Sequence, residues 1–320
     1  MWEKFRNNKE VAVFIAFLII GLAVYANSFG NRFFWDDDDV VVKNIYVHNF
    51  QLDKFFSQNE IAGSFGQISN YWRPLLLISF AVDYKVWGLS PFGFHLTNTL
   101  LHVFAAWLVF ILLYQLIELL RLNKNTPHLA PPEADKAARD TLLNKGDYLL
   151  AFLPALFFLI HPLQTEAVTY VAGRGEPLSA VLSLLSLIFY LVFRTDGRKK
   201  FFFWALIFFA GGILVKEQTV YLPLIVLLIE LVFFLKNFPQ DIGKIVKNTA
   251  AFFALAAIYL AARLTILNFN HILSGSVNFV SAAYHQSIWQ RAYTFCLAVW
   301  NYLRLLFVPT GLHMEWQITP

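Results

Sequence analysis

Four consecutive aspartates, Asp36 to Asp39, follow Trp35 and Phe34 shortly after the first apolar segment of the chain. Adjacent carboxylates repel one another, so such a run needs cations or hydrogen-bond donors close by. In most proteins it is simply a solvated loop. Here it lies between aromatic residues near the end of a segment long enough to cross a membrane, where carboxylates are costly and often functional. Asp36 and Asp37 are therefore candidates for a base that accepts a proton.

Three basic side chains also lie in short polar segments next to apolar runs. Arg73 occurs in Tyr71-Trp72-Arg73-Pro74-Leu75, Arg174 precedes Gly175-Glu176, and Lys216 precedes Glu217. Cations close to a carboxylate at a membrane surface are suited to binding a phosphate group. Other interpretations are open: Arg73 beside aromatic residues is equally typical of an interfacial anchor, and Lys216 beside Glu217 of a structural ion pair.

Histidines accompany these charged residues. His161 and Glu166 lie in one polar connection, but their separation of five positions suits a zinc site poorly, so charge pairing with Arg174 is favoured over a metal. His95, Asn98 and His102 share one face of a helix and should point into the bundle. For His102 we favour a satisfied polar contact between helices.

The composition indicates that the helices that position these residues lie in a lipid bilayer. Of 320 residues, 58% are hydrophobic and 14% are charged, whereas soluble domains are about one quarter charged. This excludes a disordered chain, a nucleic-acid-binding module and an ordinary soluble enzyme. Apolar runs without alternation predict helices in a bilayer. Eight such runs predict an all-α polytopic membrane protein: residues 11–27, 94–120, 149–160, 178–193, 201–215, 220–235, 250–267 and 289–308.

The distribution of lysine and arginine predicts the orientation of these helices. One set of connections holds fifteen Lys and Arg residues and the opposite set holds seven, although the second set is longer. Basic residues stay on the cytoplasmic side, so the N-terminus should be cytoplasmic. Residues 31–92 then form a large first extracytoplasmic loop with short amphipathic helices, and residues 122–147 form a cytoplasmic loop. The single cysteine, Cys296, excludes an intramolecular disulfide.

Several motifs occur in a fixed order between Asn27 and Glu217. They are Phe34-Trp35-Asp36-Asp37, Tyr71 to Leu75, Asp83-Tyr84, Trp87-Gly88-Leu89, the His95, Asn98 and His102 set, His161-Pro162, Thr165 to Val168, Gly173-Arg174 and Lys216-Glu217. As an ordered set they resemble the membrane part of the transmembrane-and-TPR-containing O-mannosyltransferases and their prokaryotic relatives. More distantly, they resemble other glycosyltransferases of the GT-C superfamily.

This resemblance implies a GT-C-type bundle over residues 1–320. It also implies inverting transfer of a sugar, mannose being the expected one, from a polyprenyl-phosphate donor to a hydroxyl of an extracytoplasmic protein or glycan. Asp36 or Asp37 would be the base, and Asp36 aligns better because it directly follows Trp35. The cations Arg73, Arg174 and Lys216 would bind the donor phosphate. The substrate pocket would include His161, Glu166, Glu176, Glu217, His95 and Tyr71.

The resemblance leaves other points open. Some GT-C enzymes hold a divalent cation at the acidic motif and others do not, so a metal at Asp36 and Asp37 is an open question. The relatives usually carry further membrane helices and a helical-repeat domain beyond the equivalent of these 320 residues. The protein would lie in the plasma membrane of a prokaryote or the endoplasmic reticulum of a eukaryote. A non-catalytic scaffold or subunit of a larger assembly is the alternative, and a transporter is less favoured because most charges cluster at one surface.

Overall fold

The computed structural model describes residues 8–125, 145–234, 241–265, 267 and 287–312, and within these residues the regular elements are all helices. Each of the eight apolar runs contributes a helix. These are α1 (Asn8–Val24), α5 (Pro91–Asn125), α7 (Lys145–Ile160), α9 (Gly175–Asp196), α10 (Lys199–Val215), α11 (Leu222–Ile229) continued by η7 (Glu230–Phe234), α12 (Ile242–Leu264) and α13 (Ile288–Phe307). The prediction of an all-α polytopic membrane protein is confirmed.

Length and composition qualify fewer than eight of the described helices as membrane spans. Within the described residues, four helices are long and apolar enough to cross a membrane, or five if the bent pair around His161 is one span. The helices α1 and α10 have 17 residues each. At 1.5 Å per residue they rise about 26 Å, slightly less than a hydrocarbon core of about 30 Å. The predicted count of eight spans is therefore not confirmed.

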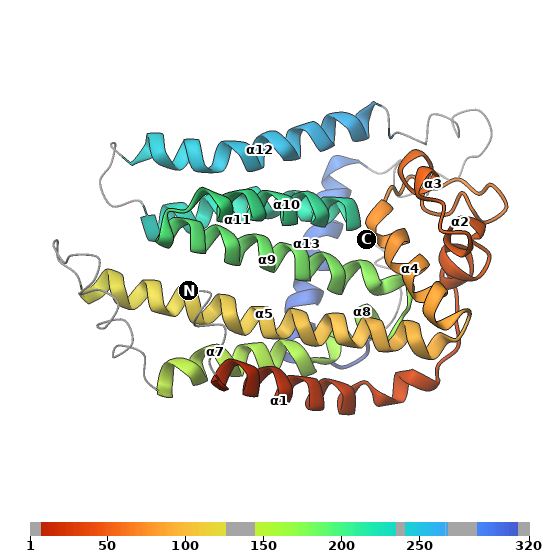
Figure 1. Ribbon diagram of the computed structural model, residues 1–320, viewed down its shortest axis with the longest axis horizontal. Helices are drawn as coiled ribbons and strands as arrows, with labels where there is room; N and C mark the ends of the chain where they lie inside the picture. The colour runs from red at the N-terminus through yellow and green to blue at the C-terminus, as the bar shows by residue number, and fades with distance from the viewer. Residues whose placement is uncertain (1–7, 126–144, 235–240, 266, 268–286, 313–320) are drawn as a thin grey trace.

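The long helices run side by side, as Figure 1 shows for α1, α5, α9, α10 and α12. One apolar core joins α1, α5, α7 and α9, and a second joins α9 through α12. Because α9 contributes to both cores, it is the central helix of the bundle. Two of its buried polar groups bond to neighbouring helices: Ser186 donates to the carbonyl of Ala205 at 2.7 Å, and Tyr190 donates to the buried Glu230.

Residues 31–92 fold into short helices at one end of the bundle (Figure 1). They are η3 (Asp38–Val42), α2 (Ile45–His48), α3 (Leu52–Ser57) and α4 (Pro74–Trp87). Proline at the first position of α4 suits a helix start, since its fixed φ is already helical and its missing N–H would have no partner there. A third apolar core packs this segment against the start of α5 and the ends of α9 and α10. The loop is thus a folded layer over the bundle.

Two further short connections meet this layer. The chain between α7 and α9 forms η4 (Pro162–Gln164), α8 (Thr165–Thr169) and η5 (Ala172–Arg174), and the chain after α10 forms η6 (Glu217–Tyr221). These connections bring segments that are far apart in sequence to the same end of the bundle. Most of the predicted cytoplasmic loop at residues 122–147 lies outside the described residues, as do parts of the other connections used to predict orientation.

Candidate functional site

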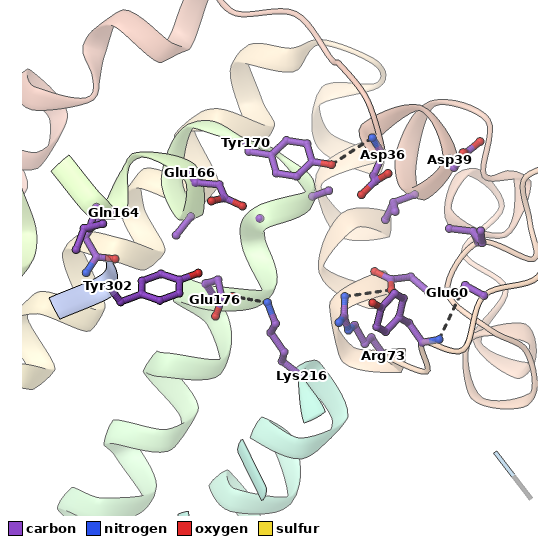
Figure 2. Close-up of a pocket in the computed structure, with 18 residues that line it drawn as sticks. Asp36, Asp39, Glu60, Arg73, Gln164, Glu166, Tyr170, Glu176, Lys216 and Tyr302 are labelled. Atoms are coloured by element: carbon purple, nitrogen blue, oxygen red, sulfur yellow. Dashed lines mark hydrogen bonds and ion pairs between the residues drawn. The ribbon is translucent and has the colours of Figure 1, made fainter. Parts of the chain in front are cut away.

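A cavity of about 660 Å³ lies where the first loop meets the connections after α7 and α10. Its volume is within the usual range for sites that bind small molecules. Figure 2 shows Asp36, Tyr170 and Glu166 along one side of it, with Arg73 and Lys216 below them in the view. Acidic and basic groups from separate parts of the sequence therefore share one open space.

The two leading acidic candidates have opposite environments. Asp36 is exposed and lines the cavity, whereas Asp37 is fully buried. The carboxylate of Asp37 accepts hydrogen bonds from the backbone N–H of Ala172 at 2.7 Å and of Phe34 at 3.1 Å. Burial outweighs these bonds and raises the pKa of Asp37 to about 6. Asp37 therefore fastens the acidic segment to the bundle, and Asp36 is the one directed to the cavity.

The backbone before Asp36 adopts an unfavourable conformation. Trp35 has a φ of +55°, in the left-handed region where a residue with a Cβ carries a penalty of about 1–2 kcal/mol. Two contacts with Tyr170 hold this conformation: the Trp35 ring stacks on the Tyr170 ring with a centroid separation of 6.5 Å, and the N–H of Asp36 donates to the Tyr170 hydroxyl at 3.2 Å. Strain maintained by surrounding contacts is frequent at functional sites.

Arg73 lines the cavity between two carboxylates. Its guanidinium donates twice to Glu217, at 2.7 and 3.1 Å, and once to Glu60 at 3.2 Å. Burial lowers the pKa of Arg73, but the nearby carboxylates outweigh that effect and raise it, so Arg73 stays positively charged. The guanidinium also lies 4.3 Å from the centre of the Tyr71 ring, which itself lines the cavity. Glu217 is engaged with Arg73 and is not among the lining residues.

Lys216 reaches the cavity from the end of α10. Its ammonium group forms an ion pair with Glu176, whose side chain is 43% exposed, whereas that of Lys216 is 16% exposed (Figure 2). An ion pair with one well-solvated partner holds its cation weakly. An incoming anion can therefore replace the partner of Lys216 more easily than the partners of Arg73, because Arg73 is bonded to two carboxylates.

Arg174 lies inside the protein and not on the cavity surface. It is fully buried, and its guanidinium donates to Asp83 at 2.5 Å and to Asn98 at 2.7 Å, with further bonds to the carbonyls of Ser79 and Phe94. These partners belong to α4 and α5, so Arg174 ties both helices to the connection before α9. Of the three cations expected to face a phosphate, Arg73 and Lys216 reach the cavity and Arg174 does not.

Of the remaining predicted residues, some line the cavity and others do not. Glu166 is exposed and lines the cavity, as does Glu176. His161 is buried and connects backbone groups: its Nδ1 accepts from the N–H of Leu163 at 3.1 Å, and its Nε2 lies 3.0 Å from the carbonyl of Leu306. His95 is fully buried in α5 and does not line the cavity. The structure therefore gives both histidines positions away from the cavity surface.

Three polar residues of this site that sequence reasoning missed stand out. Glu60, Tyr170 and Tyr302 all line the cavity. Glu60 follows an amphipathic stretch without any motif, and Tyr302 lies in the last helix, so neither carries a signal in the sequence. Tyr170 lies between two segments that did attract attention, Thr165 to Val168 and Gly173-Arg174. Its place between these two segments is the signal by which Tyr170 could have been predicted as a site residue.

The cavity residues do not fit the metal site left open for the acidic motif. Within the described ranges, three or more His, Cys, Asp or Glu side chains never gather in a way that could hold a metal ion. The Asp37 carboxylate is fully buried, accepts two backbone N–H groups and does not line the cavity that Asp36 lines, so the two are not placed as a pair of ligands on one open site.

The relatives found by comparison with known proteins are named protein O-mannosyl-transferases. Protein O-mannosyl-transferase Tmtc2 of Drosophila melanogaster is 28% identical over 317 residues, which cover 93% of this chain and 29% of the relative. The tmtc2 protein of Xenopus laevis is 27% identical, over 93% of this chain and 34% of its own length. Human TMTC4 is 28% identical, over 65% of this chain and 28% of its own length. The chain thus spans about one third or less of these relatives.

No family model matches the chain, and no solved structure matches it. The sequence relatives are nevertheless consistent in kind, and two of them align with almost all of the chain. The resemblance that the ordered motifs predicted is therefore confirmed: over most of its length this all-α membrane protein is similar to the TMTC O-mannosyltransferases.

Proposed function

We propose that this protein transfers a sugar, mannose being the expected one, from a polyprenyl-phosphate-linked donor to a hydroxyl group of a protein or glycan. The observation that carries the proposal is that the exposed carboxylate of Asp36 shares one cavity with Lys216 and Arg73. The names of the relatives, protein O-mannosyl-transferases, support glycosyl transfer as the class of reaction.

The proposed reaction needs one base and one stabilised leaving group. The acceptor oxygen attacks the anomeric carbon of the donor sugar, and its proton passes to the carboxylate of Asp36. The bond between the anomeric carbon and the phosphate oxygen breaks, and its electron pair leaves with the polyprenyl phosphate. Attack on the face opposite the leaving group inverts the anomeric centre. Product release and loss of the proton to water return Asp36 to its starting state.

The two cavity cations have different proposed roles. Lys216 binds the donor phosphate after exchanging Glu176 for it, since the Lys216–Glu176 pair is partly solvated. Arg73 lies beside it, held in place by Glu60 and Glu217, and adds positive potential where charge develops on the leaving group. Arg174, predicted from the sequence to bind phosphate, instead supports the segment that positions Asp36 and Asp37.

The acceptor and the membrane complete the proposal. Glu166 and Tyr71 line the cavity and are placed to accept hydrogen bonds from, or stack against, the sugar and acceptor. In the orientation predicted from the basic residues, this end of the bundle faces the extracytoplasmic side and the N-terminus is cytoplasmic. A polyprenyl donor would then enter from the bilayer, and the acceptor from outside.

The test compares two cavity variants with a control on the same loop. The purified protein in lipid nanodiscs is given radiolabelled polyprenyl-phosphate mannose, and both binding and transfer to secreted-protein acceptors are measured. Asp36→Asn should still bind donor and lose about 100- to 10,000-fold in transfer rate, the range expected for loss of a general base. Lys216→Met should weaken donor binding. Asp53→Asn removes an exposed carboxylate that does not line the cavity, and should behave as wild type.

Two outcomes would reject the proposal. Unchanged turnover in Asp36→Asn would remove the assigned base. A wild-type protein that binds the donor but transfers nothing to any acceptor would instead indicate a non-catalytic scaffold with a retained binding site.

A further inference from the structure

Tyr170 lies where the acidic segment meets the connection before α9. The residue is 8% exposed, and its ring contacts both aromatic residues that precede Asp36: the centroid separation is 5.0 Å to Phe34 and 6.5 Å to Trp35. Its hydroxyl accepts the backbone N–H of Asp36 at 3.2 Å, and Figure 2 shows this bond at the edge of the cavity. One side chain therefore contacts three consecutive residues of the motif.

The backbone that carries Tyr170 is fixed by buried groups. Asn98 donates through Nδ2 to the carbonyl of Tyr170 at 2.9 Å, and its Oδ1 accepts from Arg174 at 2.7 Å. Arg174 is in turn held by Asp83 at 2.5 Å. A side chain supported in this way has little freedom to follow a moving loop, so it can impose a position on its partner.

The acidic segment is attached to this support at two adjacent residues. Tyr170 accepts the N–H of Asp36, and the N–H of Ala172 donates to the carboxylate of Asp37 at 2.7 Å. The backbone between Trp35 and Asp36 must be held because Trp35 has a φ of +55°. If the attachment at Asp36 is removed, Trp35 is free to relax toward a favourable conformation and the Asp36 side chain turns away from its present direction.

The hydroxyl of Tyr170 also has a proton to donate. Burial and the nearby carboxylates of Asp36 and Asp37 raise the pKa of Tyr170, so the phenol is protonated at neutral pH. Its oxygen accepts the Asp36 N–H, and its O–H can donate to the Asp36 carboxylate, with which it interacts directly. Such a bond orients the carboxylate that is to accept the proton.

We infer that Tyr170 is a positioning residue that aims the carboxylate of Asp36 at the acceptor hydroxyl. The inference rests on the proposed function, because it assigns Tyr170 a role through the proposed base. Tyr170 itself neither gains nor loses a proton in the reaction. Its contribution should be seen in turnover and not in donor binding, since donor phosphate is bound by Lys216.

The test uses Tyr170→Phe, which keeps the ring and its contacts and removes only the hydroxyl. We expect kcat to fall about 10- to 100-fold, as for loss of a hydrogen bond to a charged group. The KM for polyprenyl-phosphate mannose should stay within about twofold, because hydrogen bonding to Asp36 does not bind donor. Tyr221→Phe is the matched control, because Tyr221 is 63% exposed and does not line the cavity.

A second measurement separates positioning from general support of the fold. In the Asp36→Asn background, Tyr170→Phe should change the residual rate by less than about twofold, since the group through which it acts is gone.

The outcomes distinguish the inference from the proposed function. An Asp36→Asn variant with full activity would refute the proposed function. Inactive Asp36→Asn together with a wild-type kcat in Tyr170→Phe would refute only the inference. An equal loss from Tyr170→Phe with and without Asp36 would also refute it, because that pattern belongs to a merely structural residue.

Discussion

Replacing Arg174 with methionine should be among the most destabilising single changes in the chain. The guanidinium is fully buried and donates to two side chains and two backbone carbonyls. Methionine has a comparable length and is apolar, so the change removes these bonds with little loss of volume. What remains is Asp83, a carboxylate whose side chain is 8% exposed, without its cation.

The magnitude follows from the group left behind. Removing one partner of a buried ion pair costs about 3–5 kcal/mol, because the remaining charge has no compensation. Thr97 still donates to Asp83 at 3.0 Å, which favours the lower half of this range. At about 2–4 °C per kcal/mol, a cost of about 3–4 kcal/mol should lower the apparent melting temperature by roughly 6–16 °C.

The loss should depend on pH in a defined direction. Burial already raises the pKa of Asp83, against the opposing effect of Arg174, and the variant removes that opposing effect. An acid whose pKa is raised on folding binds its proton more tightly when folded, so stability falls as pH rises above its unfolded pKa of about 4. Arg174→Met should therefore be closer to wild type at pH 5 than at pH 8.

The assay is thermal unfolding in detergent, followed by circular dichroism at both pH values. Arg198→Met is the control: Arg198 pairs with Asp196, and its side chain is 51% exposed, so its loss should cost at most about 1 kcal/mol. Adding Asp83→Leu to Arg174→Met should restore part of the stability, because an apolar pair has no charge left to satisfy. An Arg174→Met protein within about 1 kcal/mol of wild type at pH 8 would refute the reasoning.

Two further predictions concern the segments that Arg174 supports. Because burial raises the pKa of Asp37 to about 6, the free energy of unfolding should fall by about 3 kcal/mol as pH rises from about 4 to above 6. Asp37→Asn should remove this pH dependence. Free energies of unfolding, measured by denaturant titration at several pH values, that fall equally with pH in both proteins would contradict it. A Cβ at Gly173 would lie 2.8 Å from the carbonyl oxygen of Glu166, so Gly173→Ala should cost about 1–3 kcal/mol and lower transfer. Gly243→Ala meets no atom within 4 Å and should be neutral in the same melting assay.

Much of the fold could be predicted because it depends on local composition. Each apolar run satisfies its own backbone as a helix, so its existence follows from the residues within it. The number of spans could not be predicted as reliably, because α7 bends at His161-Pro162, and α1 and α10 are marginal in length. Where a helix bends and where it ends depend on its packing against other helices, and hydropathy alone does not predict either.

The site was predicted in part for the same reason. The motifs identified the residue types, and six of the predicted residues do line one cavity: Asp36, Tyr71, Arg73, Glu166, Glu176 and Lys216. The sequence could not distinguish a cation that faces a cavity from one that ties helices together. Arg174 and Lys216 both lie at the edge of an apolar run, and only their partners tell them apart.

The amino-acid sequence by itself determined that the chain is a helical membrane protein, and which charged residues accompany its helix ends, because both are properties of short segments. Only the tertiary structure decided that Asp36 faces the cavity while Asp37 is buried, since Asp37 is held by Ala172, 135 positions away. The same holds for Arg73, whose partner Glu217 is 144 positions away. Contacts at such separations are set by the packing of the whole bundle, and no local pattern encodes them.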